Sequence, residues 1–362
     1  MRDSFAKLFW PVIAGLLAGI LILNFHHSGQ ELLANTKDGY HRAVAIAAPS
    51  VVNIYSEKLI TRKINPFIEQ LLKNNSIPQS NARRRVEQSL GSGVIMSSNG
   101  HILTNHHVIS EASAIRILLH DGRETNAMIV GSDPRSDLAV LKIDMPELQA
   151  AKVADSNEVN VGEIVLAIGN PLGIGQSATL GIISGIGRYF FTPNAYEDFI
   201  QTDAIIHQGS SGGALVNTKG LLIGINALTY SPSRTSSKIS SANGFGLVTP
   251  INMAMFVLQE IITYGEVRRG WLGVTVEPAH TSSNKNLPPD SLLVQHVSSG
   301  GPADLAGLKP GDLIVAIDNN PIDDGRSTML KISMLKPGEE INISLLRNTK
   351  LLNLSAVLGE MN

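Results

Sequence analysis

The chain has 362 residues, of which 43% are hydrophobic and 17% are charged, and its formal net charge is -2. This length accommodates about two domains with sizeable cores, and a charge so near zero provides no strong field for nucleic acid or an acidic substrate. Cysteine is absent, which excludes disulfides, catalytic thiols and zinc–thiolate sites.

The N-terminal segment predicts a membrane anchor. Residues 8–25 contain no charged side chain, and at about 1.5 Å per residue they nearly span a hydrocarbon core of about 30 Å. No small-x-small cleavage site follows, so an uncleaved anchor is favoured over a signal peptide. Because positive residues favour the cytoplasmic side, Arg2 and Lys7 predict that residues 1–7 lie in the cytoplasm. The chain that follows the anchor is then expected on the other side of the membrane. Residues 26–40 are then expected to form a polar linker.

Short β-rich runs begin at residue 51 and fall into two sets. The first set comprises residues 51–55, 93–96, 101–108, 115–119 and 138–143, and the second comprises 164–168, 178–186, 199–206 and 221–228. Asn99-Gly100 and Asp121-Gly122 lie between consecutive runs of the first set, and such dipeptides are typical of hairpins. Many short strands at this spacing predict a sandwich or a barrel.

Two polar segments interrupt these sets. Residues 57–90 have weak periodicity and contain the basic run Arg83-Arg84-Arg85, and residues 231–243 are rich in serine. Both segments are predicted to be mobile loops. The basic run is expected to be solvated, with lipid head groups as its alternative partner.

A helix is predicted after the second set of strands. Thr249 is the expected cap, Pro250 suits the first helical position, and Gly265 ends the segment. Between them one face of the helix is apolar, and its residues are Ile251, Ala254, Met255, Leu258, Ile261 and Ile262. This spacing predicts a helix that packs on the β-rich part.

A second domain is expected after this helix. Its predicted strands cover residues 271–276, 292–296, 313–317, 341–346 and 351–357. Gly301-Pro302-Ala303 opens one short helix, and residues 331–335 belong to another that Pro337-Gly338 ends. No cluster of titratable residues resembles an active site here, so this domain is expected to bind rather than to catalyse.

Three short segments carry the candidate chemistry, and they contain, in chain order, His107, Asp137 and Ser211. Serine is a poor nucleophile at neutral pH unless an imidazole takes its proton and a carboxylate holds that imidazole in the right tautomer. The order His, Asp, Ser is one of three known arrangements and is the one used by two-barrel β proteases. The combination predicts a serine protease.

The glycines of Gly209-Ser210-Ser211-Gly212-Gly213 have a physical reason. A sharp turn directs Oγ of Ser211 toward the cleft, and glycine permits the backbone conformation that this requires. We expect Gly209, Ser210 and Ser211 to form the oxyanion hole, with the N–H groups of Gly209 and Ser211 as donors. Ser210 is the alternative nucleophile, although the glycine frame favours Ser211.

His106 and His107 are both candidates for the base. Adjacent residues of a strand face opposite sides, so only one of the two can meet Ser211. Metal binding by the pair is an alternative reading, but no His-Glu-x-x-His pattern accompanies it. No metal and no cofactor are expected.

At these residues the chain resembles the HtrA/Deg family of serine proteases. The segments 103–108, 137–142 and 209–217 are similar to the motifs of that family. The family motif Thr-Asn-x-His-Val places the base at His107. Ser210 is a departure, because asparagine is usual there, and both residues are small and polar.

The resemblance implies a mainly β fold, with a chymotrypsin-like double β-barrel protease domain at residues 41–265 and one PDZ domain at residues 266–362, after an N-terminal transmembrane helix. Trp271-Leu272-Gly273-Val274 is similar to the PDZ loop whose amides bind a peptide's terminal carboxylate, with Trp where Tyr is usual. Leu228 is implied as part of a shallow apolar specificity pocket. Arg188 is implied as the basic residue that relays PDZ occupancy to the active site.

A single PDZ domain behind an anchored protease resembles the regulatory branch of the family. This implies a homotrimer on the bacterial inner membrane, with its protease and PDZ domains in the periplasm. The C-termini of misfolded outer-membrane porins would bind the PDZ domain, and the enzyme would then cleave an RseA-like anti-sigma factor. Two alternatives remain, a broad quality-control protease and a PDZ adaptor or holdase with a vestigial active site.

Overall fold

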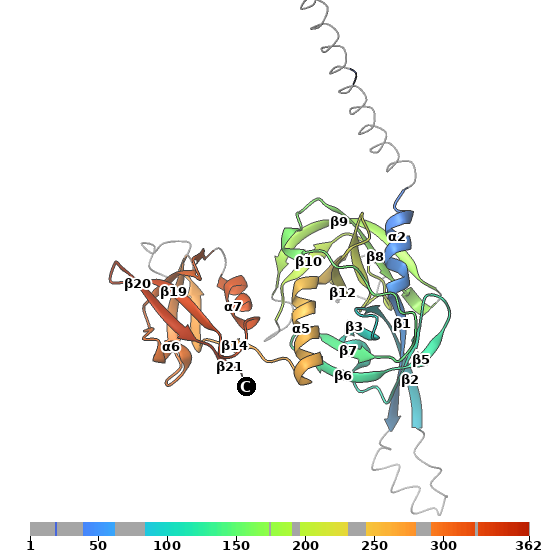
Figure 1. The fold of residues 1–362 in the computed structure, drawn as a ribbon, viewed down its shortest axis with the longest axis horizontal. Helices are drawn as coiled ribbons and strands as arrows, with labels where there is room; N and C mark the ends of the chain where they lie inside the picture. Colours follow the sequence, from blue (N-terminus) through green and yellow to red (C-terminus); the bar gives the residue numbers. More distant parts are fainter. Residues whose placement is uncertain are drawn as a thin grey trace, which may run out of the picture.

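The computed structural model describes residues 19, 39–61, 84–173, 175–189, 196–230, 244–279, 291–322 and 325–361. They form a β-rich body of two halves with a smaller β domain beside it (Figure 1). The predicted anchor, Gly19 apart, and the predicted serine-rich loop lie outside these residues. Among the described residues, no helix has the length and apolar character needed to span a bilayer.

The first half of the body is an antiparallel sheet of seven strands, namely β1 (Val51–Thr61), β2 (Arg84–Ile95), β3 (His101–Asn105), β4 (Ala114–Leu118), β5 (Glu124–Asn126), β6 (Met128–Asp133) and β7 (Leu138–Lys142). Their order is β5-β4-β1-β2-β3-β7-β6. The two edge strands, β5 and β6, are separated along the chain by Ala127 alone. The sheet therefore has to curve until its edges meet, and the covalent chain joins them.

The second half is a closed barrel of six strands, namely β8 (Ile164–Gly169), β9 (Ser177–Arg188), β10 (Phe199–Thr202), β11 (Ala214–Asn217), β12 (Leu222–Tyr230) and β13 (Phe245–Pro250). Their order around the barrel is β10-β13-β12-β11-β8-β9. The predicted double barrel is therefore a hydrogen-bonded barrel in the second half only. Four strands of the two halves were not predicted from the sequence, namely β5, β6, β11 and β13. Strands β5 and β11 have only three and four residues, and β6 is only partly buried.

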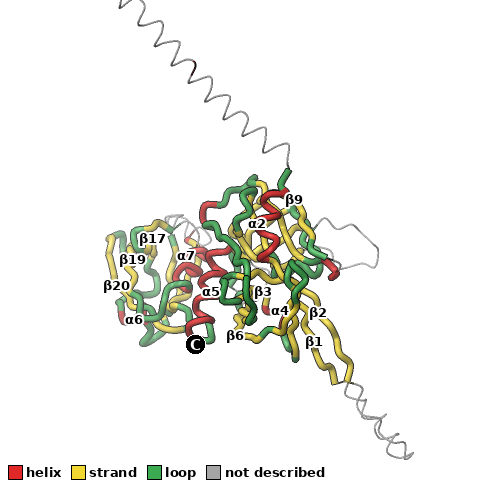
Figure 2. The backbone as a smooth tube through the Cα atoms, turned by 45° about the vertical axis from the view of Figure 1, so that its right-hand side comes forward, coloured by secondary structure: helices red, strands yellow, loops and turns green. Residues whose placement is uncertain are grey.

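Strands β1 and β2 correct the expectation of a loop at residues 57–61 and 84–90, and the rest of that predicted loop, residues 62–83, lies outside the described residues. The two strands remain paired as far as the partners Thr61 and Arg84, and they form a ribbon that extends beyond the rest of the sheet (Figure 2). Backbone groups supply the pairing in such a ribbon, so it does not need the apolar alternation of a half-buried strand. The polar sequence of these two strand ends therefore shows no strand pattern.

The two halves share a hydrophobic core. Buried side chains from both sheets meet there, and helices α2 (His41–Ala47) and α5 (Ile251–Tyr264) contribute to the same cluster. Each half also has a cluster of its own. Shorter helical turns are η1 (Ala48–Ser50), α4 (His106–Ile109), η2 (Ser156–Glu158) and η3 (Pro171–Gly173).

Helix α5 buries four residues of the predicted apolar face, Ile251, Ala254, Leu258 and Ile261, whereas Met255 and Ile262 are exposed, and it starts one residue later than expected. Pro250 is its N-cap residue, and Thr249 lies in β13 and makes no cap. Gly265 ends the helix in a left-handed conformation with φ 83° and donates its N–H to the carbonyl of Ile261. The glycine signal therefore located the C-terminus correctly.

The C-terminal domain contains strands β14 (Gly270–Trp271), β15 (Val274–Pro278), β16 (Leu292–Val297), β17 (Leu313–Ile317), β18 (Asn320–Pro321), β19 (Glu340–Arg347), β20 (Lys350–Val357) and β21 (Gly359–Glu360), with helices α6 (Pro302–Leu305) and α7 (Gly325–Ser333). Its main sheet has the order β15-β16-β17-β19-β20, and β14 pairs with β21. The predicted second helix exists, but it ends at Ser333 rather than at residue 335.

A buried ion pair joins this domain to the body. Arg269 is 5% exposed and follows α5, and its Nη2 lies 2.5 Å from Oδ2 of Asp133, at the end of β6. The guanidinium also lies over the ring of Tyr196, 4.1 Å from its centroid. Met361 donates its N–H to the carbonyl of Arg269 (3.1 Å) and accepts from the hydroxyl of Tyr196 at Sδ (2.7 Å). These contacts fix the linker and the end of the chain against the body.

We expect Asp133→Asn to lower the free energy of unfolding by about 3–5 kcal/mol, because the amide leaves the Arg269 guanidinium buried without a counter-charge. Denaturant titration of both proteins measures the difference. The matched control is Glu124→Gln, which removes the carboxylate that Arg116 contacts at 2.8 Å on the exposed surface. That change is expected to cost at most about 1 kcal/mol. Equal losses in the two variants would contradict the importance of the buried pair.

Candidate active site

His107 and Asp137 form a hydrogen-bonded pair where two neighbouring strands meet. Strand β3 ends opposite the start of β7, with Asn105 paired to Leu138. Oδ2 of Asp137 lies 2.7 Å from Nδ1 of His107, and Oδ1 accepts the His107 N–H at 2.9 Å. The two contacts hold the imidazole and leave Nε2 as the ring nitrogen that is available for chemistry.

The backbone carbonyl of Asp137 accepts two hydrogen bonds from the segment Asn105–His107, as many as its carboxylate does. The φ of Asp137 is 53°, in the left-handed region that non-glycine residues seldom adopt. Its carbonyl accepts from the N–H of His106 and from Nδ2 of Asn105, both at 3.0 Å. The first amides of a helix have no partner within the helix, and Asp137 supplies acceptors for those of His106 and His107.

This arrangement corrects the expectation of a strand over residues 101–108. Strand β3 ends at Asn105 and α4 begins at His106, because Asp137 draws both histidine amides toward itself. Successive residues of a helix are about 100° apart rather than on opposite sides. The two side chains still differ in exposure, since that of His107 is 48% exposed whereas Nδ1 of His106 is buried.

The segment before Ser211 is a tight turn. The N–H of Ser210 donates to the carbonyl of His207 at 2.9 Å, which closes a β-turn over residues 207–210. Gly209 occupies its third position with φ 94°, whereas Gln208 has no positive φ. This is the type II pattern, which requires glycine or asparagine at the third position.

The turn leaves two amides without a partner. Among the described residues, the N–H groups of Gly209 and Ser211 donate no hydrogen bond, whereas that of Ser210 is used by His207 and that of Gly212 by Asn226 (2.7 Å). Free, closely spaced N–H groups at a glycine turn are the donors that an oxyanion needs. Of the three residues expected to form the oxyanion hole, Gly209 and Ser211 therefore have available amides, and Ser210 supports the turn.

Two hollows flank the turn and share Gln208. One, of about 510 Å³, is lined by His107, Val108 and Gly209 among others. The other, of about 710 Å³, is lined by Ser211 and by Leu228, with Ile205 and Ile206 as further apolar walls. The structure therefore places His107, which Asp137 holds, at one hollow and Ser211 with the expected pocket residue Leu228 at the other, and the two hollows meet at Gln208. Among the hydrogen bonds of the described residues, the His107 ring has one, to Asp137, and none to the Ser211 hydroxyl; catalytic hydrogen bonds are often long or poorly aligned before substrate binds.

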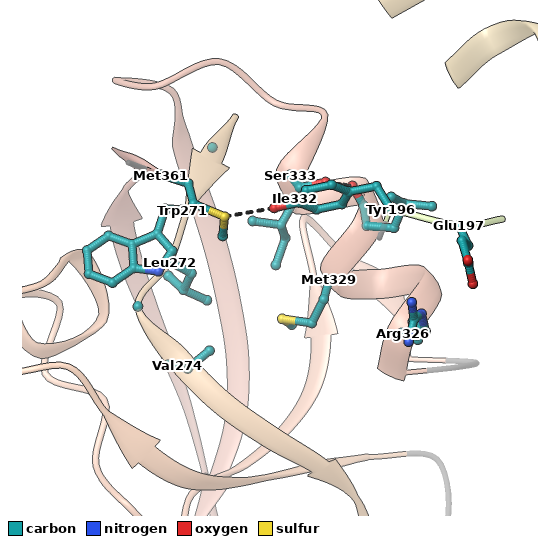
Figure 3. A pocket seen from close by; sticks show the side chains of 13 residues that line it. Tyr196, Glu197, Trp271, Leu272, Val274, Arg326, Met329, Ile332, Ser333 and Met361 are labelled. Atoms are coloured by element: carbon teal, nitrogen blue, oxygen red, sulfur yellow. Dashed lines mark hydrogen bonds between the residues drawn. The ribbon is translucent and has the colours of Figure 1, made fainter. Parts of the chain in front are cut away.

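The predicted carboxylate-binding loop lines a separate hollow of about 270 Å³. Trp271, Leu272, Gly273 and Val274 line it together with residues of α7, among them Met329 and Ile332, which Figure 3 labels. Gly273 has φ 80°, a conformation that favours glycine. Sequence reasoning did not identify three further lining residues, Tyr196 and Glu197 from the body and Met361 from the end of the chain.

Arg188 is the last residue of β9, in the protease body. Its Nε donates to Oε1 of Gln201 on the neighbouring strand β10 (3.0 Å). The next residue, Tyr189, stacks under Arg326 of α7, with 4.9 Å between the guanidinium carbon and the ring centroid. The predicted relay residue is therefore adjacent to a contact between the body and the C-terminal domain.

Comparison with known proteins assigns both parts of the chain. Residues 91–225 match the trypsin-like peptidase domain, and residues 270–358 match the PDZ domain. The serine endoprotease DegS of Escherichia coli K12 is 36% identical over 371 residues, which cover 98% of each chain. The chain belongs to the HtrA/Deg family of serine proteases.

Further HtrA/Deg proteins are similar over large parts of the chain. The periplasmic pH-dependent serine endoprotease DegQ of Escherichia coli K12 is 41% identical over 276 residues, which cover 75% of this chain and 59% of DegQ. The solved structure of the HtrA-type protease AlgW with a decapeptide has a TM-score of 0.69 and 41% identity, and it covers 90% of this chain and 99% of its own. The chain is therefore a serine-type endopeptidase with one PDZ domain.

The geometry around Asp137 predicts different roles for the two histidines. His107→Ala is expected to lower kcat roughly a millionfold, because the base is lost from a unit that acts together. His106→Ala is expected to keep kcat within about tenfold, a barrier change of about 1.4 kcal/mol. Steady-state cleavage of a reporter peptide by both variants, with circular dichroism as the folding control, measures this. The reverse order of activities would assign the base to His106.

Proposed function

We propose that this chain is a membrane-anchored serine endoprotease of the bacterial periplasm, which cleaves an RseA-like anti-sigma factor when a peptide binds its PDZ domain. The observation that carries the catalytic part is the His107–Asp137 pair beside a turn with free amides at Gly209 and Ser211. Similarity to DegS over nearly the whole chain supports the regulatory part.

In the proposed mechanism, Oγ of Ser211 attacks the carbonyl carbon of the scissile bond while Nε2 of His107 takes the hydroxyl proton. The carbonyl oxygen becomes an oxyanion that accepts from the N–H groups of Gly209 and Ser211. His107 then gives its proton to the leaving amine, and an acyl group remains on Ser211. Water repeats the sequence in the second half of the reaction. The Asp137 carboxylate stabilises the imidazolium that forms.

The two hollows suggest how a substrate lies in the cleft. The hollow next to Ser211 is walled by Ile205, Ile206 and Leu228, which favours an apolar side chain before the scissile bond. His107 gives its proton to the leaving amine, which belongs to the residue after the scissile bond. The hollow next to His107 is therefore proposed to receive the residues that follow this bond. Leu228 is accordingly proposed as a residue that determines specificity.

Replacement of the nucleophile tests the catalytic proposal. Ser211→Ala is expected to lower kcat roughly a millionfold and to abolish labelling by a fluorophosphonate, while the thermal unfolding midpoint stays close to that of the original protein. Ser210→Ala is the matched control at the neighbouring serine, and it should still be labelled. Full cleavage by Ser211→Ala would remove the basis of the proposal.

Control of the protease activity by the PDZ domain is proposed because residues of both domains line the hollow at the PDZ loop. Tyr196 and Glu197 of the protease domain line it together with Trp271–Val274 of the PDZ domain. A peptide that enters with its terminal carboxylate at the loop therefore contacts the protease domain directly. Arg188, which lies beside the Tyr189–Arg326 contact, is proposed to relay this occupancy to the active site. Porin C-termini are the proposed natural peptides.

We also propose how the chain is organised around the membrane. Residues 1–7 are cytoplasmic, 8–25 form the anchor in the inner membrane, 26–40 form a linker, 41–265 form the protease domain and 266–362 form the PDZ domain. A homotrimer is proposed for the periplasmic part. Exposed apolar side chains at the adjacent strands β8 and β9 support self-association, namely Ile164, Leu180 and Ile182.

A free peptide with an aromatic C-terminal residue is expected to raise kcat/KM for a reporter substrate by about 5- to 150-fold, the range of typical coupling energies. The same peptide with an amidated C-terminus is the control, since it lacks the carboxylate that the loop amides bind. Equal rates with both peptides would contradict PDZ control. Rapid degradation of casein without peptide would favour a broad quality-control protease, which the similarity to DegQ makes the second candidate.

A further inference from the structure

Ser92 lies in β2, in the first half of the protease domain. It contacts residues 207–212 of the second half, which we call the nucleophile turn. Ser92 is fully buried, with 0% exposure. We propose that Ser92 is a positioning residue that holds the nucleophile turn in its reactive conformation. This inference rests on the proposed function, in which Ser211 is the nucleophile and the amides of Gly209 and Ser211 bind the oxyanion.

Every polar group of Ser92 has a partner. Its hydroxyl donates to the carbonyl of Gly209 (2.8 Å) and accepts from the N–H of Asn170 (2.9 Å). Its own N–H donates to the carbonyl of Ser211 (2.8 Å), and its carbonyl accepts from Oγ1 of Thr104 (2.7 Å). One residue of the first half therefore binds two carbonyls of the turn.

These two contacts fix two peptide planes. In the plane between Gly209 and Ser210, Ser92 Oγ holds the carbonyl and the His207 carbonyl holds the N–H. In the plane between Ser211 and Gly212, the Ser92 N–H holds the carbonyl and the Asn226 carbonyl holds the N–H. A planar peptide that is bound at both ends cannot rotate without losing both hydrogen bonds.

The free amides of Gly209 and Ser211 flank these fixed planes. Their direction depends on the torsions of Gly209 and Ser211, which the fixed planes restrict. The carbonyl of Ser92 also lies where a side chain on Gly212 would begin, since an added Cβ would stand 2.1 Å from it. The turn therefore packs directly on β2, and Ser92 is placed to keep both amides aimed at one point.

Ser92→Ala isolates the hydroxyl contribution, because the backbone contact from the Ser92 N–H to Ser211 is retained. We expect kcat to fall about 10- to 100-fold, less than the 10²–10³-fold typical for loss of an oxyanion donor, because both amides remain but are held less firmly. KM is expected to change by less than threefold. Inhibition by a peptide boronic acid, which bonds to Ser211 Oγ and places an oxygen at the oxyanion position, should weaken by a factor similar to that in kcat.

The matched control is Ser50→Ala. Ser50 is likewise buried (2% exposed) and its hydroxyl donates to a backbone carbonyl, that of Ala47 at 2.7 Å, but it lies in η1 and not at the turn. Ser92→Ala loses two buried hydrogen bonds and Ser50→Ala loses one, so both variants should lose thermal stability, whereas only Ser92→Ala should lose kcat and boronate affinity. Ser92→Cys, which keeps a weaker donor, is expected to fall between serine and alanine and replaces Ser92→Ala if that variant does not fold.

The outcomes separate this inference from the proposed function. If the original protein cleaves the reporter and Ser211→Ala does not, the proposed function stands. If Ser92→Ala then matches Ser50→Ala in kcat and in boronate affinity, the positioning role is wrong and Ser92 serves stability alone. If cleavage by the original protein does not depend on Ser211, the proposed function itself fails.

Discussion

The hydrogen bonds that Asp137 accepts from the segment Asn105–His107 hold the candidate active site together. A left-handed φ costs a non-glycine residue about 1–2 kcal/mol, whereas each hydrogen bond to a charged group contributes about 1.5–3 kcal/mol. The two bonds between the Asp137 carboxylate and His107 therefore outweigh the strain. They also explain why β3 stops at Asn105 and why the imidazole has one orientation.

The nucleophile turn depends in the same way on contacts from its own half and from the other half. Ser92 of β2 and Asn226 of β12 bind backbone groups on either side of Ser211. The shared core, which contains side chains from both sheets and from α2 and α5, keeps the two halves at the distance that these bonds require. The reactive geometry is therefore a property of the interface between the halves.

Residues of the protease domain form part of the lining of the hollow in the PDZ domain. Buried contacts attach the two domains to each other at this point. Arg269 is buried against Asp133, and Asp133 also accepts from the hydroxyl of Ser136, beside the candidate catalytic aspartate. Tyr196 contacts both Arg269 and Met361 and lines the hollow. One residue of the protease domain thus contacts the linker, the end of the described chain and the hollow of the PDZ domain.

The sequence by itself determined the order of the three chemical groups, the end of α5 at Gly265 and the presence of a PDZ-like loop, because each depends on local signals. It left both His106 and His107 as candidates for the base, and the pairing of His107 with Asp137 is a tertiary contact. Only the tertiary structure decided that a helix begins at His106, that the Ser210 amide is occupied, that β1 and β2 form a long ribbon, and that Tyr196 lines the peptide hollow. The physical reason is distance along the chain. Ser92 and Gly209, for example, are 117 positions apart, so their hydrogen bond exists only once the two halves have packed together.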